Sequence, residues 1–484
     1  MQPHQYPKPE NVFRFFDEIS QIPRPSGMEK AISDYLLSFA KQHDLEHFRD
    51  SANNVIIIKE ASAGREDEEP IILQGHMDMV CEKESGCSKD MEREGLDLVW
   101  EEDWISAEGT TLGGDDGIAI AIALALLEDK GLSHPRLEFV CTTEEETGMG
   151  GASVLDPAPL KGHLLLNIDS ECEGILTVGC AGGVTLKLHA PLKRIPAAES
   201  MTAVKIRLSG LTGGHSGMAV QLGRANADVL MIRILRDLSA SYPVCLCSMS
   251  GGNKNNAIPR NAEAIILTEE QHAQELLQFI AALNPVLQAE YAVTDPGLHL
   301  AAALTDEKES LTALGISDTQ ALLALLSSIP DGVQRMDQHL DNLVETSLNL
   351  GVLYTTETEL YAEYLPRSSS DSRLQDLTNR ISFIASTSGA RLDSSDQYPA
   401  WQFVPESVFR DKMIRIFEEQ YGKKPIVETV HAGLECGLLS KKIPGLDAVS
   451  IGPDIMDIHT SQEKMSISSV ERTYSYIRKI LEDK

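Results

Sequence analysis

Histidine and carboxylate residues gather in five segments of this 484-residue chain, near apolar runs and glycine-rich turns. These segments are IILQGHMDMV with His76 and Asp78, TTLGGDDGIAIA with Asp115 and Asp116, TTEEETGMGGA with Glu144, Glu145 and Glu146, LLLNIDSE with Asp169, and IMDIHTSQE with His459. Imidazole and carboxylate without thiolate suit zinc, manganese or cobalt, and a shared carboxylate lets one compact site hold two ions. Two such ions, about 3.5 to 4 Å apart, activate a bridging water and polarise a carbonyl, so hydrolysis is the predicted chemistry.

Each segment also has an ordinary structural explanation when it is taken alone. Asp115 and Asp116 could cap the helix that begins near Ile118, because aspartate commonly caps helices. The glutamates at 144–146 could be a charged surface run, and His459 could be a loop histidine. The joint occurrence of all five segments favours a metal site.

The elements that would position these residues alternate between helix and strand over the first 185 residues. Apolar spacing predicts helices at residues 11–19, 26–43 and 118–128, and strands at SANNVIIIKE, PIILQGHMDMV, LEFVCTT and HLLLNID. Alternation of this kind predicts an α/β fold, here a central mixed, mostly parallel sheet flanked by helices, of the phosphorylase/hydrolase type. Ligands of such sheets bind at the carboxyl ends of strands, where His76, Asp78 and Asp169 stand.

The middle of the chain has a different pattern of strands and helices, which predicts an inserted domain. Strands such as AVKIRLSGL and AEAIILT, with helices at 226–239 and 318–328, indicate an α+β domain. The tail, with helices at 407–421 and 468–481, resumes the first pattern. We therefore expect a catalytic domain at residues 1–186 and 391–484, and an inserted lid and dimerisation domain at 187–390.

Composition limits the compartment and the partners. The chain has 42 basic and 73 acidic residues, and its net charge of -31 repels nucleic acid and anionic membranes. Its longest apolar stretch, residues 118–127, is half the length that a membrane-spanning helix needs. The start of the chain has no secretory pattern, and its eight cysteines form no C-x-x-C pair, which indicates reduced thiols. A cytoplasmic protein without nucleic-acid or membrane partners is expected.

The motifs GHMDMV, GTTLGGDDG, TTEEETGMGGA and NIDSE, followed by a late HT pair, stand in an ordered set. This set resembles that of the M20 family of dinuclear metallopeptidases, and the resemblance covers nearly the whole chain. It extends through GCAGG, LTGGHSG, NNAIPR, HAGLECGLL and SIGP, and is closest to the aminoacyl-histidine dipeptidase branch, which includes the cytosolic non-specific dipeptidases. The resemblance implies a metal-dependent enzyme that cleaves unblocked dipeptides, Xaa-His among them, and makes a homodimer through the inserted domain plausible.

The resemblance also implies five ligands for two divalent ions, with zinc expected first and manganese or cobalt as alternatives. His76 and Asp169 would hold one ion, Glu146 and His459 the other, and Asp115 would bridge them.

Two further residues gain roles from the resemblance. Asp78 would orient the imidazole of His76, as metal-bound histidines usually require. Glu145 would deprotonate the bridging water and pass the proton to the leaving amine. Three consecutive glutamates leave this register open in principle, and the following Thr-Gly-Met-Gly-Gly favours Glu145 as the base and Glu146 as the ligand. The bond between Asp115 and Asp116 would be cis.

The inserted domain would contribute His215 of GGHSG, which the family uses to stabilise the tetrahedral oxyanion. Asn256 and Arg260 of NNAIPR, with Arg367 of LPRS, are candidates for gripping the substrate's peptide oxygen and C-terminal carboxylate. Arginine suits a planar carboxylate because its fork matches two oxygens. Arg260 and Arg367 could instead be surface residues that pair with a neighbouring acid.

His431 and Glu435 of HAGLECG have two interpretations. They could line the pocket for the substrate's N-terminus, where a carboxylate would hold the α-ammonium. They could equally form a buried structural hydrogen-bond pair.

Two other functions compete with the dipeptidase. A related amidohydrolase would remove acyl groups from N-blocked amino acids and would need no ammonium pocket. A non-enzymatic binding protein would be expected to lack a ligand or the base, and every expected position is filled here. A single structural metal is disfavoured because such sites prefer thiolates.

Overall fold

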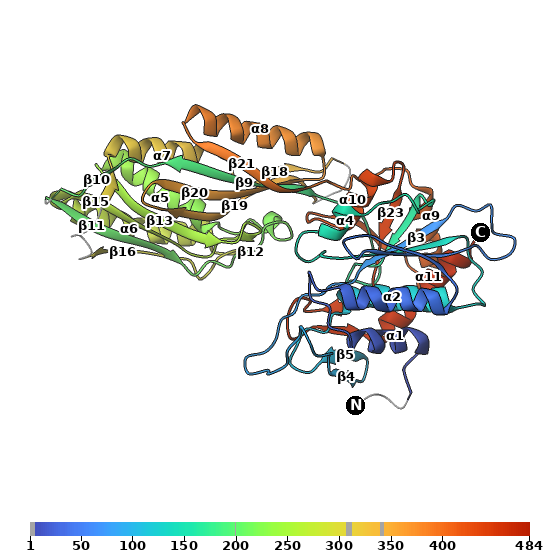
Figure 1. The fold of residues 1–484 in the computed structure, drawn as a ribbon. Helices are drawn as coiled ribbons and strands as arrows, with labels where there is room; N and C mark the ends of the chain where they lie inside the picture. The colour runs from blue at the N-terminus through green and yellow to red at the C-terminus, as the bar shows by residue number, and fades with distance from the viewer. Residues whose placement is uncertain (1–4, 199, 306–311, 339–342) are drawn as a thin grey trace. The chain divides into compact units, whose positions relative to one another are not determined.

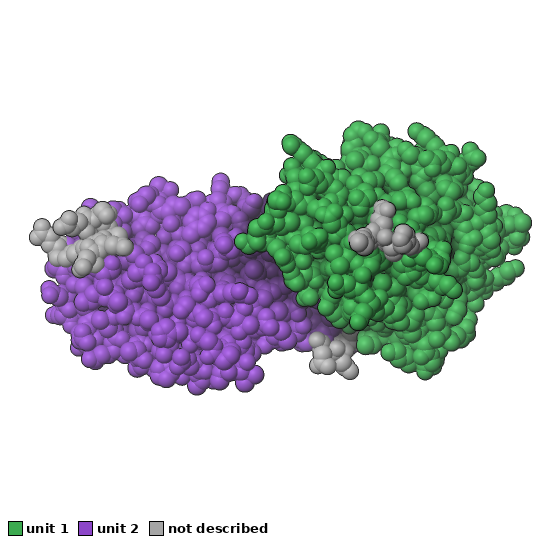
Figure 2. Space-filling view, turned by 90° about the horizontal axis from the view of Figure 1, so that it is seen from below, with its two compact units in different colours: residues 1–179, 401–429, 434–484 green, residues 180–400, 430–433 purple. Residues whose placement is uncertain are grey.

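The chain forms two compact units in the computed structural model, which describes residues 5–198, 200–305, 312–338 and 343–484 (Figures 1 and 2). The first unit comprises the residues up to Gly179 together with Trp401–Thr429 and Leu434–Lys484. The second comprises Cys180–Ala400 and Val430–Gly433. The second unit is therefore inserted in the sequence of the first, and each has its own apolar core.

The first unit is built on a mixed sheet with a parallel centre. Strand β3 pairs in parallel with β6 and β7, and β7 pairs in parallel with β23, whereas β1, β2 and β8 run antiparallel to their neighbours. The strands lie in the order β1 (Glu46–Arg49), β2 (Val55–Lys59), β6 (Leu137–Thr142), β3 (Ile71–His76), β7 (Leu164–Asn167), β23 (Asp447–Ser450), β8 (Ile175–Cys180) and β22 (Ile426–Val430). This arrangement confirms the predicted fold class.

Helix α3 (Gly114–Glu128) packs on β3 and carries the longest apolar run of the chain. Its residues from Gly117 to Leu127 are all buried, as expected for a helix that is apolar on every side. The other helices of this unit are α1 (Glu10–Ser20), α2 (Lys30–Gln42), α4 (Gly150–Val154), α9 (Val408–Tyr421), α10 (Glu435–Lys442) and α11 (Ile467–Glu482). Helix α1 packs on α3, and Figure 1 shows α1 and α2 together beside the sheet.

Helix α2 begins later than the predicted helix at residues 26–43. Residues 26–29 form a turn because their polar groups have other partners. The hydroxyl of Ser26 donates to Asp78 Oδ2 at 2.8 Å, and the amide of Gly27 donates to the carboxylate of Glu29 at 2.7 Å.

A small antiparallel sheet in the first unit holds the segment that includes His459. Its strands lie in the order β24 (Ile455–Met456), β25 (Lys464–Ser466), β5 (Trp104–Ala107) and β4 (Leu98–Glu101). His459 lies in the turn between β24 and β25, where its backbone has a φ of 59°.

The second unit has an antiparallel sheet with helices, which agrees with the predicted α+β insertion. Its strands lie in the order β16 (His299–Thr305), β11 (Met201–Ser209), β15 (Ala262–Glu269), β13 (Cys245–Asn253), β19 (Val344–Thr355), β20 (Glu359–Ser368), β9 (Gly182–Pro191) and β21 (Arg391–Tyr398), with β18 (Gly332–Met336) against β19. Helix α8 (Asp371–Thr387) lies along β9, β20 and β21 (Figure 1).

The remaining elements of the second unit are α5 (Ala227–Ser241), α6 (Glu270–Glu290), α7 (Ile316–Ser328), a 3-10 turn at Val220–Leu222, and two short pairs of strands. The pairs are β10 (Arg194–Pro196) with β17 (Thr312–Leu314), and β12 (Gly214–His215) with β14 (Ala257–Ile258). Across the described residues, no helix combines the length and the apolar character needed to cross a membrane.

Candidate metal centre

The histidines and carboxylates singled out in the first unit meet at the carboxyl ends of the parallel strands. His76 is the last residue of β3, the glutamates at 144–146 follow β6, and Asp169 follows β7. Asp115 comes from the start of α3, and His459 from the turn after β24. Side chains far apart in the sequence thus meet in one place, as Asp115 and His459 do across 344 residues.

Asp115 stands between two imidazoles, with one carboxylate oxygen toward each. Its Oδ1 lies 3.0 Å from His76 Nε2, and its Oδ2 lies 3.1 Å from His459 Nε2. Each imidazole has a second carboxylate beside it. Asp169 Oδ1 is 3.5 Å from His76 Nε2, and Glu146 Oε1 is 3.0 Å from His459 Nε2. Asp115 therefore lies between two pairs, each of one imidazole and one carboxylate.

The donor atoms are close enough, and of the right chemistry, to hold divalent cations. Three overlapping groups have ligand atoms within 4.8 Å of one another, namely His76 with Asp116 and Asp169, His76 with Glu145 and Glu146, and Asp115 with Glu146 and His459. Oxygen and imidazole donors without thiolates suit zinc, manganese or cobalt.

The electrostatics of this cluster also favour a bound cation. Burial raises the pKa of Asp169 to about 6, so its ionised form is disfavoured. Hydrogen bonds to Asp115 and Glu146 raise the pKa of His459 to about 11. Burial lowers the pKa of His76, but attraction to Asp169 and hydrogen bonds to the surrounding aspartates outweigh it and raise that pKa well above its usual range. The cluster thus has an excess of buried negative charge, which divalent ions would balance.

Asp78 holds His76 from the side opposite Asp115. Its Oδ1 lies 3.3 Å from His76 Nδ1, and its carboxylate accepts hydrogen bonds from the amides of Glu145 and Glu146 at 3.1 and 3.2 Å. The buried carboxylate therefore orients the imidazole and the glutamate segment together.

The three consecutive glutamates have different surroundings. Glu144 is exposed and has a φ of 53°, whereas Glu145 and Glu146 belong to the donor groups of the cluster. Burial, with the negative charges of Asp169 and Glu435, raises the pKa of Glu145 well above its usual range. Among the three, Glu145 and Glu146 are therefore the ones that the backbone directs toward the centre.

Asp116 contacts the backbone of His76. The peptide bond between Asp115 and Asp116 is cis, as the family resemblance implied. Asp116 is buried, and its Oδ2 accepts a hydrogen bond from the amide of His76 at 3.1 Å. A Cβ atom on Gly75 would lie 2.4 Å from this oxygen, so only glycine allows the approach.

In the second unit, His215, Asn256 and Arg260 line a common cavity of about 580 Å³. His215 Nδ1 accepts hydrogen bonds from the amides of Gly217 and Met218 at 3.2 and 3.1 Å. Burial lowers the pKa of His215 to about 4, so its imidazole is neutral near pH 7 and carries its proton on Nε2. Nε2 is therefore a neutral hydrogen-bond donor.

Arg367 and His431 also belong to the second unit. Arg367 lies on β20, is buried, and donates from Nη1 to the hydroxyl of Tyr398 at 2.6 Å. His431 Nε2 lies 2.7 Å from the hydroxyl of Ser347. Burial, together with the charge of Arg367, lowers the pKa of His431 to about 3. Both side chains are buried.

Glu435, in the first unit, has no exposed surface. Its Oε2 accepts hydrogen bonds from Gln74 Nε2 at 2.6 Å and from the hydroxyl of Thr142 at 2.5 Å. Burial raises its pKa to about 8, so the carboxyl stays largely protonated at neutral pH. Glu435 therefore pairs with Gln74 and Thr142, and His431 with Ser347, so these contacts differ from the hydrogen-bond pair of His431 with Glu435 that was one of the two sequence interpretations.

Sequence reasoning missed three charged side chains at this centre, namely Arg24, Glu171 and Glu463. Glu171 is close enough to the cluster that burial and the charges of Asp115 and Asp169 raise its pKa to about 8. Its place in Asp-Ser-Glu, two residues after Asp169, could have pointed to it. Arg24 and Glu463 bind main-chain groups of loops that are distant in the sequence. The spacing of residues in a sequence does not indicate contacts of this kind.

The fold and the donor set are those of a metallopeptidase, and the comparisons agree. The sequence matches peptidase family M20/M25/M40 over residues 72–483, and the chain belongs to this family. It is 34% identical over 478 residues to the cytosol non-specific dipeptidase of Escherichia coli (strain K12), covering 98% of each chain.

Solved structures support this assignment. The aminoacylhistidine dipeptidase from Vibrio alginolyticus matches with a TM-score of 0.90 and 33% identity, covering 98% of this chain and 96% of that one. A tripeptidase from Staphylococcus aureus, at 15% identity and a TM-score of 0.59, covers 98% of this chain and 97% of its own and shares the fold.

Proposed function

We propose that this protein is a dipeptidase that hydrolyses unblocked dipeptides, Xaa-His among them, with two divalent metal ions, of which zinc is the first expectation and manganese or cobalt the alternatives. The observation that carries the proposal is the position of Asp115, whose two oxygens face two separate pairs of imidazole and carboxylate. The names of the relatives with 34% and 33% identity support the dipeptide substrate.

Five residues would hold the metal ions. His76 and Asp169 are assigned to one ion, Glu146 and His459 to the other, and Asp115 to both. When bound, such ions lower the pKa of water and polarise a carbonyl group.

The remaining roles follow from the surroundings of each side chain. Glu145 accepts a proton from the water as its oxygen bonds to the peptide carbon, and then gives that proton to the amine nitrogen as the peptide C–N bond breaks. Asp78 keeps the ring of His76 oriented. The Nε2–H of His215 donates a hydrogen bond to the carbonyl oxygen as that oxygen becomes negative, and keeps its proton.

Substrate binding is assigned to the second unit. Asn256 and Arg260 line the same cavity as His215, which supports a part in holding the peptide oxygen or the C-terminal carboxylate. Arg367, whose charge acts on both His215 and His431, is the stronger candidate for the carboxylate. His431, in the second unit, and Glu435, in the first, are each proposed as a buried residue that holds its own neighbours by hydrogen bonds.

We also propose a cytoplasmic location and a homodimer formed through the second unit. The name of the Escherichia coli relative and the acidic charge of this chain support the first. The family resemblance supports the second.

The proposal is tested by turnover of free and N-acetylated dipeptides, with Xaa-His in both sets, in the presence of zinc, manganese or cobalt. Metal-dependent cleavage of only the free dipeptides is expected, because a dipeptidase of this kind recognises the α-ammonium. Cleavage of the acetylated set would move the assignment to an amidohydrolase. No cleavage of either set, with metal bound, would favour a binding protein.

A further inference from the structure

Glu463 is a buried glutamate, only 2% exposed. Its carboxylate accepts hydrogen bonds from four consecutive main-chain amides. The donors are Leu112 N at 2.9 Å, Gly113 N at 3.0 Å, Gly114 N at 2.8 Å and Asp115 N at 3.4 Å. These amides precede the regular part of helix α3, because Asp115 and Asp116 have non-helical backbone angles. Buried main-chain amides need an acceptor, and a carboxylate supplies charge-assisted hydrogen bonds to them.

Arg24 holds the same loop through its carbonyl groups. The guanidinium, which is 1% exposed, donates from Nη2 to the carbonyl of Gly113 at 2.5 Å. From Nη1 it donates to the carbonyls of Met77 and Asp78 at 3.2 and 3.1 Å. Arg24 therefore joins the loop before α3 to the segment that follows His76.

Burying a charge is unfavourable unless it is hydrogen-bonded, and Glu463 and Arg24 both meet this condition through main-chain groups of the loop at Leu112–Asp115. The loop that they grip contains two glycines, and Gly113 has a φ of 64°. Glycine backbones are the most mobile when they are not held. This glycine-containing loop ends at Asp115, whose two oxygens must face two imidazoles at once.

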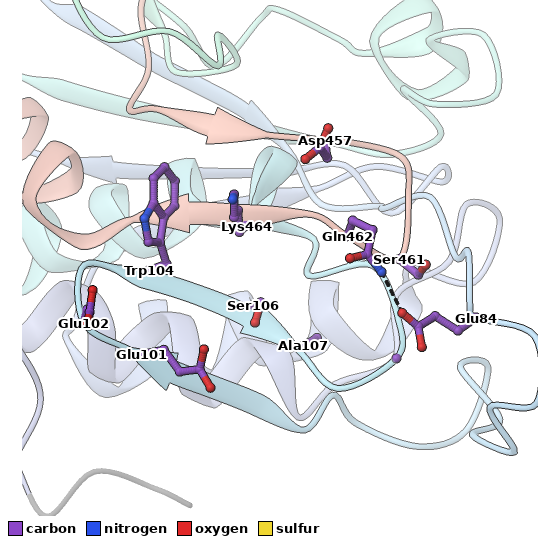
Figure 3. A pocket seen from close by; sticks show the side chains of 11 residues that line it. Glu84, Glu101, Glu102, Trp104, Ser106, Ala107, Asp457, Ser461, Gln462 and Lys464 are labelled. Atoms are coloured by element: carbon purple, nitrogen blue, oxygen red, sulfur yellow. Dashed lines mark hydrogen bonds between the residues drawn. The ribbon is translucent and has the colours of Figure 1, made fainter.

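Glu463 also belongs to the segment that carries His459, four residues earlier. The residues on either side of it, Gln462 and Lys464, are among those that line a surface cavity of about 710 Å³ (Figure 3). Gln462 Nε2 donates to Glu84 at 2.6 Å, and the Lys464 ammonium lies 4.9 Å from the centre of the Trp104 ring. Glu463 stands between the turn at Gln462 and strand β25, and it is buried while Gln462 is exposed and Lys464 only partly buried.

We propose that Glu463 and Arg24 are positioning residues of the metal centre. Together they hold the Leu112–Asp115 loop in place, and Glu463 connects it to the segment of His459. The carboxylate of Asp115 is thereby oriented toward both His76 and His459. The inference rests on the proposed function, because it assigns Asp115 to two bound ions.

The test is Glu463→Gln, studied first without metal and then by titration of zinc or manganese into the stripped protein. The amide keeps the shape of the side chain but loses the charge and one acceptor. We expect the amides of Leu112–Asp115 to exchange hydrogen about 10-fold faster in the metal-free variant, because charge-assisted bonds are lost. We also expect metal to bind about 10- to 100-fold more weakly, as loss of a group that orients a ligand typically does.

Glu138→Gln is the matched control. Glu138 is also fully buried, accepts hydrogen bonds from the amides of Lys161 and Gly162 at 3.0 Å, and pairs with Arg136, but it lies near the start of β6, away from the end where the glutamates follow. Its replacement is expected to lower stability and leave metal affinity unchanged.

Loop exchange and metal affinity that match the wild type, with only a lower melting temperature, would overturn the inference. Where Glu463→Gln does not fold, Arg24→Lys takes its place, since lysine keeps the charge and loses the fork. Arg24→Lys is also expected to exchange the amides of Leu112–Asp115 faster and to bind metal more weakly. If it shows neither change, the inference is overturned in the same way. A wild-type protein that binds neither metal would contradict the proposed function, and the exchange measurement on the metal-free chain would still test the attachment of the loop.

Discussion

At the scale of single residues, the chemistry of this centre depends on neighbours in sequence having opposite surroundings. Glu144 is exposed, whereas Glu145 is partly buried, and burial together with the charge of Asp169 raises its pKa well above the usual range. Asp115 faces the two imidazoles, whereas Asp116 binds the amide of His76 from beneath. The backbone of each turn, rather than the residue type, decides which carboxylate reaches the centre.

Replacing Glu145 by glutamine should abolish the proposed proton transfer while leaving the ligand atoms in place. Turnover is expected to fall about 100- to 10,000-fold, the range for loss of a general acid–base group, with metal content unchanged. Glu144→Gln is the matched control and should keep activity, because its side chain is exposed. Steady-state kinetics and metal analysis of both variants check this, and equal losses in the two would contradict the assignment of the base.

His431 should make stability fall in acid. Its pKa is about 3 in the folded protein and about 6.5 when unfolded. Between these values the unfolded chain binds a proton that the folded chain does not, so the free energy of unfolding decreases as pH falls from 6.5 toward 3, by up to about 1.4 kcal/mol per pH unit. Denaturant unfolding between pH 4 and 7 measures this slope.

His431→Gln is expected to remove that component of the slope, even though the loss of the contact with Ser347 lowers stability at every pH. Ser347→Ala, which removes the same contact and keeps the imidazole of His431, serves as the control and should lower stability while keeping the slope. A slope that is the same with and without His431 would contradict the argument.

At the scale of elements, the loop before α3 depends on a backbone that only glycine adopts easily. Gly113 has a φ of 64°, and a Cβ atom there would lie 2.6 Å from Arg24 Nη2 and 2.7 Å from Met79 Sδ. Gly64 has a φ of 82°, and a Cβ atom there would have no atom of the described residues within 4 Å. The two glycines therefore share the backbone strain and differ in crowding.

Gly113→Ala should destabilise the protein more than Gly64→Ala. Both substitutions incur the left-handed backbone cost of about 1 to 2 kcal/mol, and crowding against Arg24 and Met79 adds about 1 to 3 kcal/mol at Gly113. Urea unfolding of the two variants measures the difference. Equal losses of stability would show that the buried loop yields to the added methyl group.

The elements were largely predictable from sequence because their signals are local. The apolar run at residues 118–127 predicted the buried helix α3, and the strands LEFVCTT and PIILQGHMDMV were confirmed as β6 and β3. The start of α2 was wrong by four residues, because Ser26 and Glu29 bind groups outside the helix pattern. Glu463 could not be foreseen, since its partner amide on Gly113 is 350 residues away and any residue type supplies a main-chain amide.

At the scale of the whole molecule, the chain separates two tasks into two units with separate cores. The first unit gathers the side chains that could hold metal ions, and the second holds His215 in one cavity with Asn256 and Arg260. The motif order in the sequence predicted the family, whereas the roles of the individual site residues stay predictions.

The proposed homodimer has a simple physical test. Sedimentation equilibrium should give a mass of twice the 52.9 kDa of one chain at micromolar concentration. A mass equal to a single chain would contradict the dimer without affecting the assignment of the metal ligands, all of which come from the first unit.

The central claim is that two metal ions held by these five ligands make the protein a dipeptidase. Its most direct test measures turnover of an unblocked dipeptide and bound metal on the same sample, first stripped by a chelator and then resupplied with zinc. The account predicts no turnover in the stripped protein and a return of activity as the content approaches two ions per chain. Full turnover in the stripped protein, or none with two ions bound, would contradict it.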